Sequence, residues 1–149
     1  MRSPRETSAG FHFDAREFLK AAELVLNRAV DVSLPAYFLF SRSIELSLKA
    51  FLLQHGVSAK TLRSRTYGHD LDALLREAAK HGLYDRVPLE HPEIGAVEML
   101  SQEYLSARLG YRVTGGTYYL PLIEVTENVA RKLVGGLAAV CASNDTNDT

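Results

Sequence analysis

Three ionisable residues recur along one side of a long apolar stretch, Pro35–Gly56. Arg42, Glu45 and Lys49 lie three and then four residues apart, so a helix would project them from one narrow stripe. The rest of the stretch is apolar on two sides, which is typical of a central helix covered by several neighbours. Two interpretations of the stripe are open. Periodicity favours a solvated seam with a Glu45–Lys49 ion pair worth about 0.2–0.5 kcal/mol, and the other is a polar row that faces a cleft or a partner.

A second candidate for chemistry is the adjacent pair His69 and Asp70. Such a pair binds metal in phosphohydrolases, but that chemistry needs further His and Asp ligands on other helices, and the sequence has no second group of them. The sequence also lacks the glycine-rich phosphate loops and the serine-nucleophile motif. We therefore interpret His69 and Asp70 as the cap of a helix, and we expect neither a metal site nor a cofactor.

A third candidate is a basic and aromatic group divided between two segments. If folding brings residues 60–69 close to residues 108–112, the arginines could surround phosphates and the tyrosines could offer faces for base stacking. Solvated arginines that cover apolar surface, with tyrosines packed at the end of the fold, are an equally open alternative. The residues concerned are Lys60, Arg63, Arg65, Tyr67, Arg108, Tyr111 and Arg112.

Hydrophobic periodicity predicts that five helices position these residues. Asp14 offers the N-cap of the first helix, Gly56 and Gly82 end the second and third, and Pro121 opens the last. The short link before Pro35 predicts that the central helix returns antiparallel to the first and packs on it. The expected helices cover about residues 14–30, 35–55, 70–82, 94–105 and 121–141.

Between the fourth and last helices, the segment 111–120 has two short β-prone runs around Gly115 and Gly116, which indicates a hairpin or an extended loop. Along the last helix, the predicted buried face includes Leu122 and Val140. The expected fold is an all-α, up-and-down helical bundle of about five helices, with that short hairpin or loop before the last.

Length and composition limit the domain organisation and the environment. A chain of 149 residues, 46% hydrophobic and 23% charged, suits one domain with a single core. We expect a flexible N-terminus at 1–13, a helical domain at 14–141 and a disordered tail at 142–149.

A net charge of −1 excludes a globally basic nucleic-acid binder, so any polyanion would bind a local patch. Without an apolar membrane span or signal core, the protein is expected to be cytoplasmic. The single cysteine, Cys141, allows no internal disulfide and is expected to pack in the core.

Two of these stretches together suggest a family. The core of the central helix, IELSLKA at 44–50, followed by YGHDL at 67–71, resembles HEPN domains (higher eukaryotes and prokaryotes nucleotide-binding). Arg108, Tyr111 and Arg112 are similar to the Arg-Tyr signature that follows the fourth helix in part of that family. The resemblance extends over residues 14–141 and implies an all-α up-and-down bundle that is usually dimeric. HEPN proteins include metal-independent endoribonucleases, toxins paired with small nucleotidyltransferases, and non-catalytic RNA-binding or scaffold proteins.

In the ribonuclease members an Arg is followed by a His after four to six intervening residues, where His assists proton transfer and Arg supports the phosphate at a dimer interface. About one such match is expected by chance in a chain like this one, and none lies at the family position with the usual polar residue after Arg and an aromatic residue after His. The weak candidates for catalysis are His69, Arg86 and His91. The literal matches are Arg5/His12, Arg63/His69, Arg76/His81 and Arg86/His91.

The resemblance implies a nucleic-acid- or nucleotide-associated binding module in stress response, defence or a toxin–antitoxin pair with a nucleotidyltransferase. A metal-independent endoribonuclease and a non-catalytic protein-interaction scaffold are the alternatives. We expect a homodimer that binds RNA or a nucleotide, and we expect Glu45, Lys49 and His69 to line one polar patch. The full set of candidate ligand-binding residues is Glu45, Lys49, Arg63, Arg65, His69, Arg108, Tyr111 and Arg112.

Overall fold

The computed structural model describes residues 7–29, 31–105 and 117–142. Within these ranges the chain is all-helical and contains no strand, which confirms the predicted fold class. Two short helices add to the five that periodicity predicted. The helices are α1 (Ser8–Arg28), α2 (Leu34–Gln54), α3 (Ala59–Leu62), α4 (Leu71–Lys80), α5 (Leu83–Arg86), α6 (His91–Leu105) and α7 (Ile123–Ala142).

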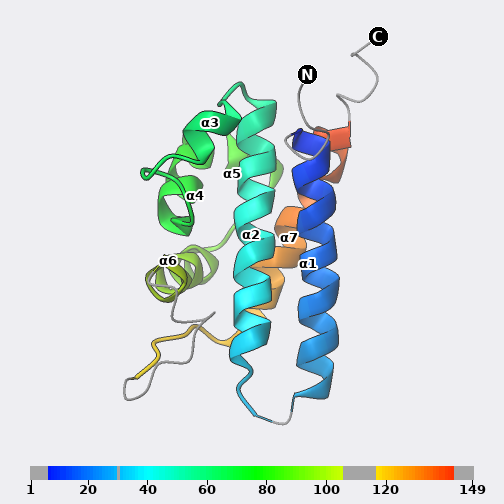
Figure 1. The fold of residues 1–149 in the computed structure, drawn as a ribbon, viewed down its shortest axis with the longest axis vertical. Coiled ribbons are helices and arrows are strands. Elements are labelled where there is room, and N and C mark those ends of the chain that lie inside the picture. The colour runs from blue at the N-terminus through cyan, green and yellow to red at the C-terminus, as the bar shows by residue number, and fades with distance from the viewer. Residues whose placement is uncertain (1–6, 30, 106–116, 143–149) are drawn as a thin grey trace.

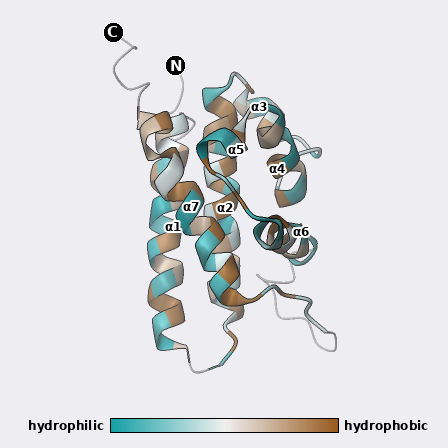
Figure 2. Cartoon of the chain, turned by 180° about the vertical axis from the view of Figure 1, so that it is seen from behind, coloured by the Kyte–Doolittle hydropathy of each residue, from teal (hydrophilic) through white to brown (hydrophobic). Residues whose placement is uncertain are grey.

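Helix α2 is the centre of the bundle, as its two apolar sides predicted. It runs antiparallel to α1 and contacts α1, α4, α6 and α7 (Figure 1). Helix α7 packs against both α1 and α2, whereas α4 and α6 cover the other side of α2, with α6 seen almost end-on. Figure 2 shows this arrangement from behind, with hydrophobic residues of α2 on several of its sides. The middle of α2 therefore meets helices from both halves of the chain.

The core is built from the apolar rows of α2 together with those of α4 and α7. Phe40, Phe51 and Leu48 of α2 have no exposed surface, and Cys141 of α7 is buried beside them, as predicted. Serines allow α1 to approach α2 closely, because Ser43 Oγ donates a hydrogen bond of 2.7 Å to the carbonyl oxygen of Ala15. This packing makes α1 and α2 a rigid support for polar residues placed between them and α6.

The ends of α2 and α4 follow the sequence signals. Gly56 and Gly82 adopt φ values of 90° and 85°, a left-handed conformation that glycine adopts without strain, directly after the C-caps of α2 and α4. Asp70 is the N-cap of α4, and its Oδ1 accepts a 3.1 Å hydrogen bond from the amide of Ala73. The interpretation of Asp70 as a helix cap is therefore confirmed.

Helix α1 begins at Ser8, earlier than the Asp14 predicted from the sequence. Thr7 is its N-cap and accepts a 2.9 Å hydrogen bond from the amide of Gly10. The extra turns are held by contacts distant in the sequence, since Ser8 Oγ donates to the carbonyl of Ala50 at 2.8 Å and His12 bonds the carbonyl of Val134 at 2.8 Å. Polar residues that look like a terminal extension are thus part of the bundle.

The start of α7 also differs from the prediction. Pro121 precedes the first helical residue, Ile123, and Leu122 is 72% exposed instead of belonging to the buried face. Val140 is half-buried. The predicted hairpin at 111–120 falls mainly outside the described residues, and its described part, 117–120, is irregular. Within the described chain, no helix combines the length and the apolar character that crossing a membrane requires.

Candidate functional site

Glu45 lies at the middle of α2, where its carboxylate is completely buried. Its Oε2 accepts hydrogen bonds from Lys49 Nζ at 2.7 Å and from Arg42 at 2.9 Å. Helical spacing brings both cations to the same side of α2, as the sequence predicted. The interpretation of this row as a solvated seam is wrong, because Lys49 is only 7% exposed and Glu45 is not exposed at all. Helices α4 and α6 cover the row, and periodicity alone does not show that cover.

The other carboxylate oxygen of Glu45 joins two further segments. Oε1 accepts a 2.5 Å hydrogen bond from the Tyr104 hydroxyl of α6 and lies 2.9 Å from Nδ1 of His69, which stands just before the cap of α4. The structure therefore brings Glu45, Lys49 and His69 together. We call Arg42, Glu45, Lys49, His69 and Tyr104 the Glu45 cluster.

Contacts between α4 and α6 fix the position of His69. The Ser101 hydroxyl of α6 donates to Asp70 Oδ1 at 3.1 Å and accepts from the amide of Asp72 at 3.1 Å. Asp70 is thus held by its own helix and by α6 at once. Because His69 is its neighbour in the chain, the imidazole is held against Glu45 and Tyr104, whose ring it meets edge-on at 5.6 Å.

The electrostatics of the Glu45 cluster keep the carboxylate ionised and the phenol neutral. Burial alone would raise the pKa of Glu45, but Lys49, Arg42 and the hydrogen bonds from Lys49 and Tyr104 outweigh it and hold that pKa below its ordinary value. Burial, followed by the charge and hydrogen bond of Glu45, raises the pKa of Tyr104 well above its ordinary range. Tyr104 is therefore a permanent donor to the carboxylate near neutral pH.

His69 is the part of the Glu45 cluster that reaches the surface, with 62% of its side chain exposed. An ionised Glu45 accepts from Nδ1, so this arrangement favours the tautomer with the proton on Nδ1 and leaves Nε2 for solvent or a ligand. Arg42 is also partly exposed, with its guanidinium 5.8 Å from the centre of the Phe18 ring. Two permanent cations face one carboxylate, so the cluster carries an excess of positive charge near an exposed histidine. Such a surface suits a phosphate group.

The other predicted site residues lie elsewhere. Arg63 and Arg65 are exposed on the segment between α3 and α4, and Lys60 is exposed on α3. Arg86 is exposed at the end of α5, and His91 is exposed at the start of α6. Three members of the predicted basic group, Arg108, Tyr111 and Arg112, lie outside the described residues.

Two of the other Arg/His matches have structural explanations. His12 is buried and bonds the carbonyl of Val134, and Arg5 lies outside the described residues. His81 Nε2 lies 3.3 Å from the carboxylate of Glu77 on the same helix. Arg76 of α4 pairs with Asp72 at 3.2 Å.

Sequence reasoning missed Tyr104 and Ser101 as partners of this site. Tyr104 lies within the fourth helix expected from the sequence, 94–105, and its hydroxyl reaches a residue 59 positions away. Local spacing carries no signal for such a contact. Within the described residues, no group of three or more His, Cys, Asp or Glu side chains is placed to hold a metal ion.

The fold and the Glu45 cluster define a class of small all-helical module with a buried, charged centre that opens to the surface at one histidine. The sequence model of the HEPN domain matches residues 12–140, which include every residue of the cluster. The chain therefore belongs to the HEPN domain family and is a module of the nucleotide-binding or ribonuclease type. No curated protein and no solved structure matches it.

Proposed function

We propose that this HEPN domain binds single-stranded RNA or a nucleotide at the surface where His69 and Arg42 emerge from the Glu45 cluster. The observation that carries the proposal is the hydrogen bond between His69 Nδ1 and the buried Glu45, at 2.9 Å. It holds the imidazole in one orientation, so its exposed edge meets a ligand without a large loss of conformational entropy.

The charge balance of the cluster supports an anionic ligand. Arg42 and Lys49 more than neutralise Glu45, and a phosphate near the partly exposed Arg42 and His69 would meet the remaining positive charge. The whole chain has a net charge of −1, so attraction for RNA would be local and few phosphates would be contacted. Weak, salt-sensitive binding of a short segment fits this distribution better than wrapping of a long duplex.

The test is fluorescence anisotropy with a labelled single-stranded RNA. His69→Ala should weaken binding about tenfold, the loss of one hydrogen bond to a charged group. His91→Ala removes another exposed histidine, at the start of α6, and serves as the matched control. Equal binding by wild type, His69→Ala and His91→Ala would place the RNA elsewhere and refute this site.

A metal-independent endoribonuclease is the second candidate, and the same Glu45–His69 hydrogen bond favours it. A carboxylate that holds Nδ1–H leaves Nε2 as the proton acceptor and fixes its direction, as a general base for a ribose hydroxyl requires. Cleavage of RNA in the presence of EDTA that disappears in His69→Ala would support the enzyme. Binding without cleavage would leave the non-catalytic module.

The biological setting we propose is a stress or defence response, including a toxin–antitoxin pair with a nucleotidyltransferase. The support is membership of the HEPN family, whose members include toxins of that kind. Co-purification of the tagged chain with a nucleotidyltransferase encoded beside it would support the pair. Capture of a protein partner combined with no RNA binding would favour the scaffold alternative.

A further inference from the structure

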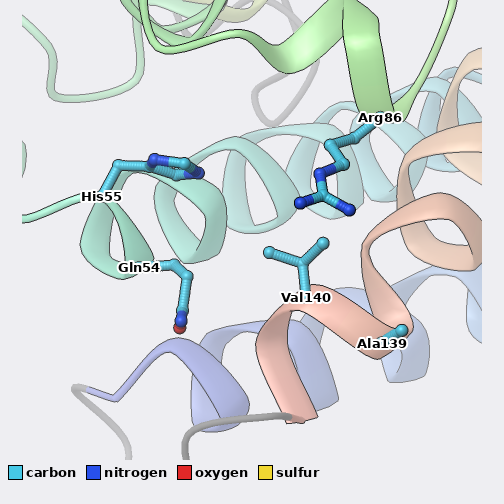
Figure 3. A pocket seen from close by; sticks show the side chains of 5 residues that line it. All are labelled: Gln54, His55, Arg86, Ala139 and Val140. Atoms are coloured by element: carbon cyan, nitrogen blue, oxygen red, sulfur yellow. The ribbon is translucent and has the colours of Figure 1, made fainter.

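A hollow lies at the end of the bundle where α2, α5 and α7 finish, far along α2 from its link to α1 (Figure 3). Its volume is about 310 Å³. We call it the Arg86 groove. It is lined by Gln54, His55, Arg86, Ala139 and Val140.

Arg86 is the main charged group of the groove. Its guanidinium makes no hydrogen bond or ion pair with any side chain that the structure describes, and Figure 3 shows it directed between His55 and Val140. Among the described residues, none that lines the groove carries a carboxylate. An exposed guanidinium that points into a hollow instead of onto a carboxylate is available for a ligand with two acceptor oxygens.

His55 adds a second hydrogen-bond donor to the groove. Its ring stacks on Phe51 at 4.2 Å and lies 5.9 Å from the ring of His81. Burial, followed by the nearby charges of His81 and Arg86, lowers the pKa of His55. The carboxylate of Glu77 lies 3.3 Å from Nε2 of His81, and from α7 the described residues that line the groove are Ala139 and Val140. An anion bound in the groove would offset the repulsion that His81 and Arg86 exert on a protonated His55.

These side chains are not needed to cap the helix ends at which they stand. The C-terminal carbonyls of α2 already accept backbone hydrogen bonds, since the amide of His55 donates to Phe51 and the amide of Val57 donates to Leu52. At the end of α4, the amide of His81 donates to Ala78 in the same way. Within the described part of the chain, neither the imidazole of His55 nor the guanidinium of Arg86 is used to cap these helix ends.

Gln54 also lines the groove, and its Oε1 is buried without a hydrogen-bond partner among the described residues. Figure 3 shows its amide directed away from His55 and Arg86, so we assign it no contact with the ligand. Ala139 and Val140 form an apolar wall of the groove, against which the carbons of a sugar would pack.

From these features we infer that the Arg86 groove binds the phosphate monoester of a sugar phosphate, such as the 5′-phosphate end of a nucleotide or of an RNA. Arg86 and the N–H of His55 donate to the phosphate oxygens, and Ala139 and Val140 pack against the sugar. The groove is separate from the Glu45 cluster, so this inference goes beyond the proposed function.

The test is calorimetric titration of the full chain with 5′-AMP and, for comparison, adenosine and inorganic phosphate. We expect AMP to bind at least about tenfold more tightly than adenosine, and Arg86→Ala to remove most of that difference. Arg86→Lys should keep part of it, since an ammonium retains the charge but not the two-pronged geometry. Arg28→Ala is the charge-matched control, because Arg28 ends α1 at the opposite end of the bundle.

A further comparison identifies the source of the phosphate. RNA with a 5′-phosphate that binds more tightly than the same RNA with a 5′-hydroxyl, in wild type but not in Arg86→Ala, would identify an RNA end. AMP binding without that difference would identify a free nucleotide. Equal binding of AMP and adenosine, or AMP binding unchanged in Arg86→Ala, would overturn the inference.

The AMP titration and the RNA-binding test of the proposed function can fail independently of each other. His69→Ala should leave the difference between AMP and adenosine intact, because His69 lies in the Glu45 cluster and not in the groove. If RNA binding does not depend on His69 while AMP binding depends on Arg86, the Glu45 site fails and the groove stands. The reverse pattern would remove the groove and keep the Glu45 site.

Discussion

Among single residues, Glu45 is the side chain whose loss should destabilise the protein most. Glu45→Ala would leave Lys49, 7% exposed, without its carboxylate, and breaking a buried ion pair in this way costs about 3–5 kcal/mol of unfolding free energy. Urea denaturation measures the change. Glu17→Ala is the control, because Glu17 and Lys20 form an exposed pair and the change there should stay within about 0.5 kcal/mol. Similar values for the two variants would contradict the burial of the Glu45 cluster.

The depressed pKa of Glu45 predicts a specific loss of stability in acid. A carboxyl whose folded-state pKa is below its unfolded-state value stabilises the protein above that unfolded value, near 4.5, and the stabilisation is lost as the pH falls through the folded-state pKa. Unfolding free energies measured from pH 7 downward should therefore fall more steeply below pH 4.5 in wild type than in Glu45→Gln. Parallel curves would show that Glu45 does not carry this dependence.

The residue scale also shows how far local spacing predicts a site. The row of Arg42, Glu45 and Lys49 followed from helical geometry, because all three lie on one helix. The burial of this row did not follow from helical geometry, because the helices that cover it, α4 and α6, are distant in the sequence. His69 was placed near Glu45 through a family resemblance, whereas nothing in the spacing of the chain connects Tyr104 with either of them.

Among the elements, α7 has two adjacent glycines whose surroundings differ. A Cβ added to Gly135 would meet open space, whereas one added to Gly136 would lie 2.7 Å from Cγ2 of the buried Val87. Gly135→Ala should raise the unfolding free energy by about 0.5–1 kcal/mol through helix propensity. Gly136→Ala gains the same propensity, but the clash with a stiff β-branched side chain should cost about 1–3 kcal/mol.

Thermal or urea unfolding of the two glycine variants gives the comparison directly. Adding Val87→Ala should relieve the Gly136→Ala variant, because the clashing methyl group is then absent, and a double-mutant cycle isolates this coupling. Two alanine variants of equal stability would mean that α7 does not pack against Val87 as closely as the structure places it.

The sequence predicted the helix ends that a glycine or a capping carboxylate marks. It did not predict the helix ends that are held by contacts distant in the sequence. Gly56, Asp70 and Gly82 mark the ends of α2 and α4 correctly. The start of α1 was not predicted correctly, because Ser8 and His12 find their hydrogen-bond partners only in the folded bundle. The helices α3 and α5 have four residues each, which is too short to produce a period.

At the scale of the whole molecule, the homodimer expected from the sequence remains a prediction, and the structure offers a surface for it. Apolar side chains are exposed at the end of α6 and before α7, where Leu105 is 53%, Tyr119 69% and Leu122 72% exposed. Large apolar residues gathered at one end of a bundle favour association with a second apolar surface. In a twofold dimer, the same patch on each copy would meet its equivalent.

Leu122→Glu should therefore shift the protein toward monomer, because each copy would place a carboxylate in the interface near that of its twin. Phe13→Glu is the matched control, since Phe13 is 57% exposed on the first half of α1 and lies away from this patch. Light scattering over a wide range of concentrations measures both variants and wild type. A wild-type monomer at every concentration would refute the dimer, and with it a composite nuclease site shared by two copies. A dimer that survives Leu122→Glu but dissociates in Phe13→Glu would instead assign the interface to α1.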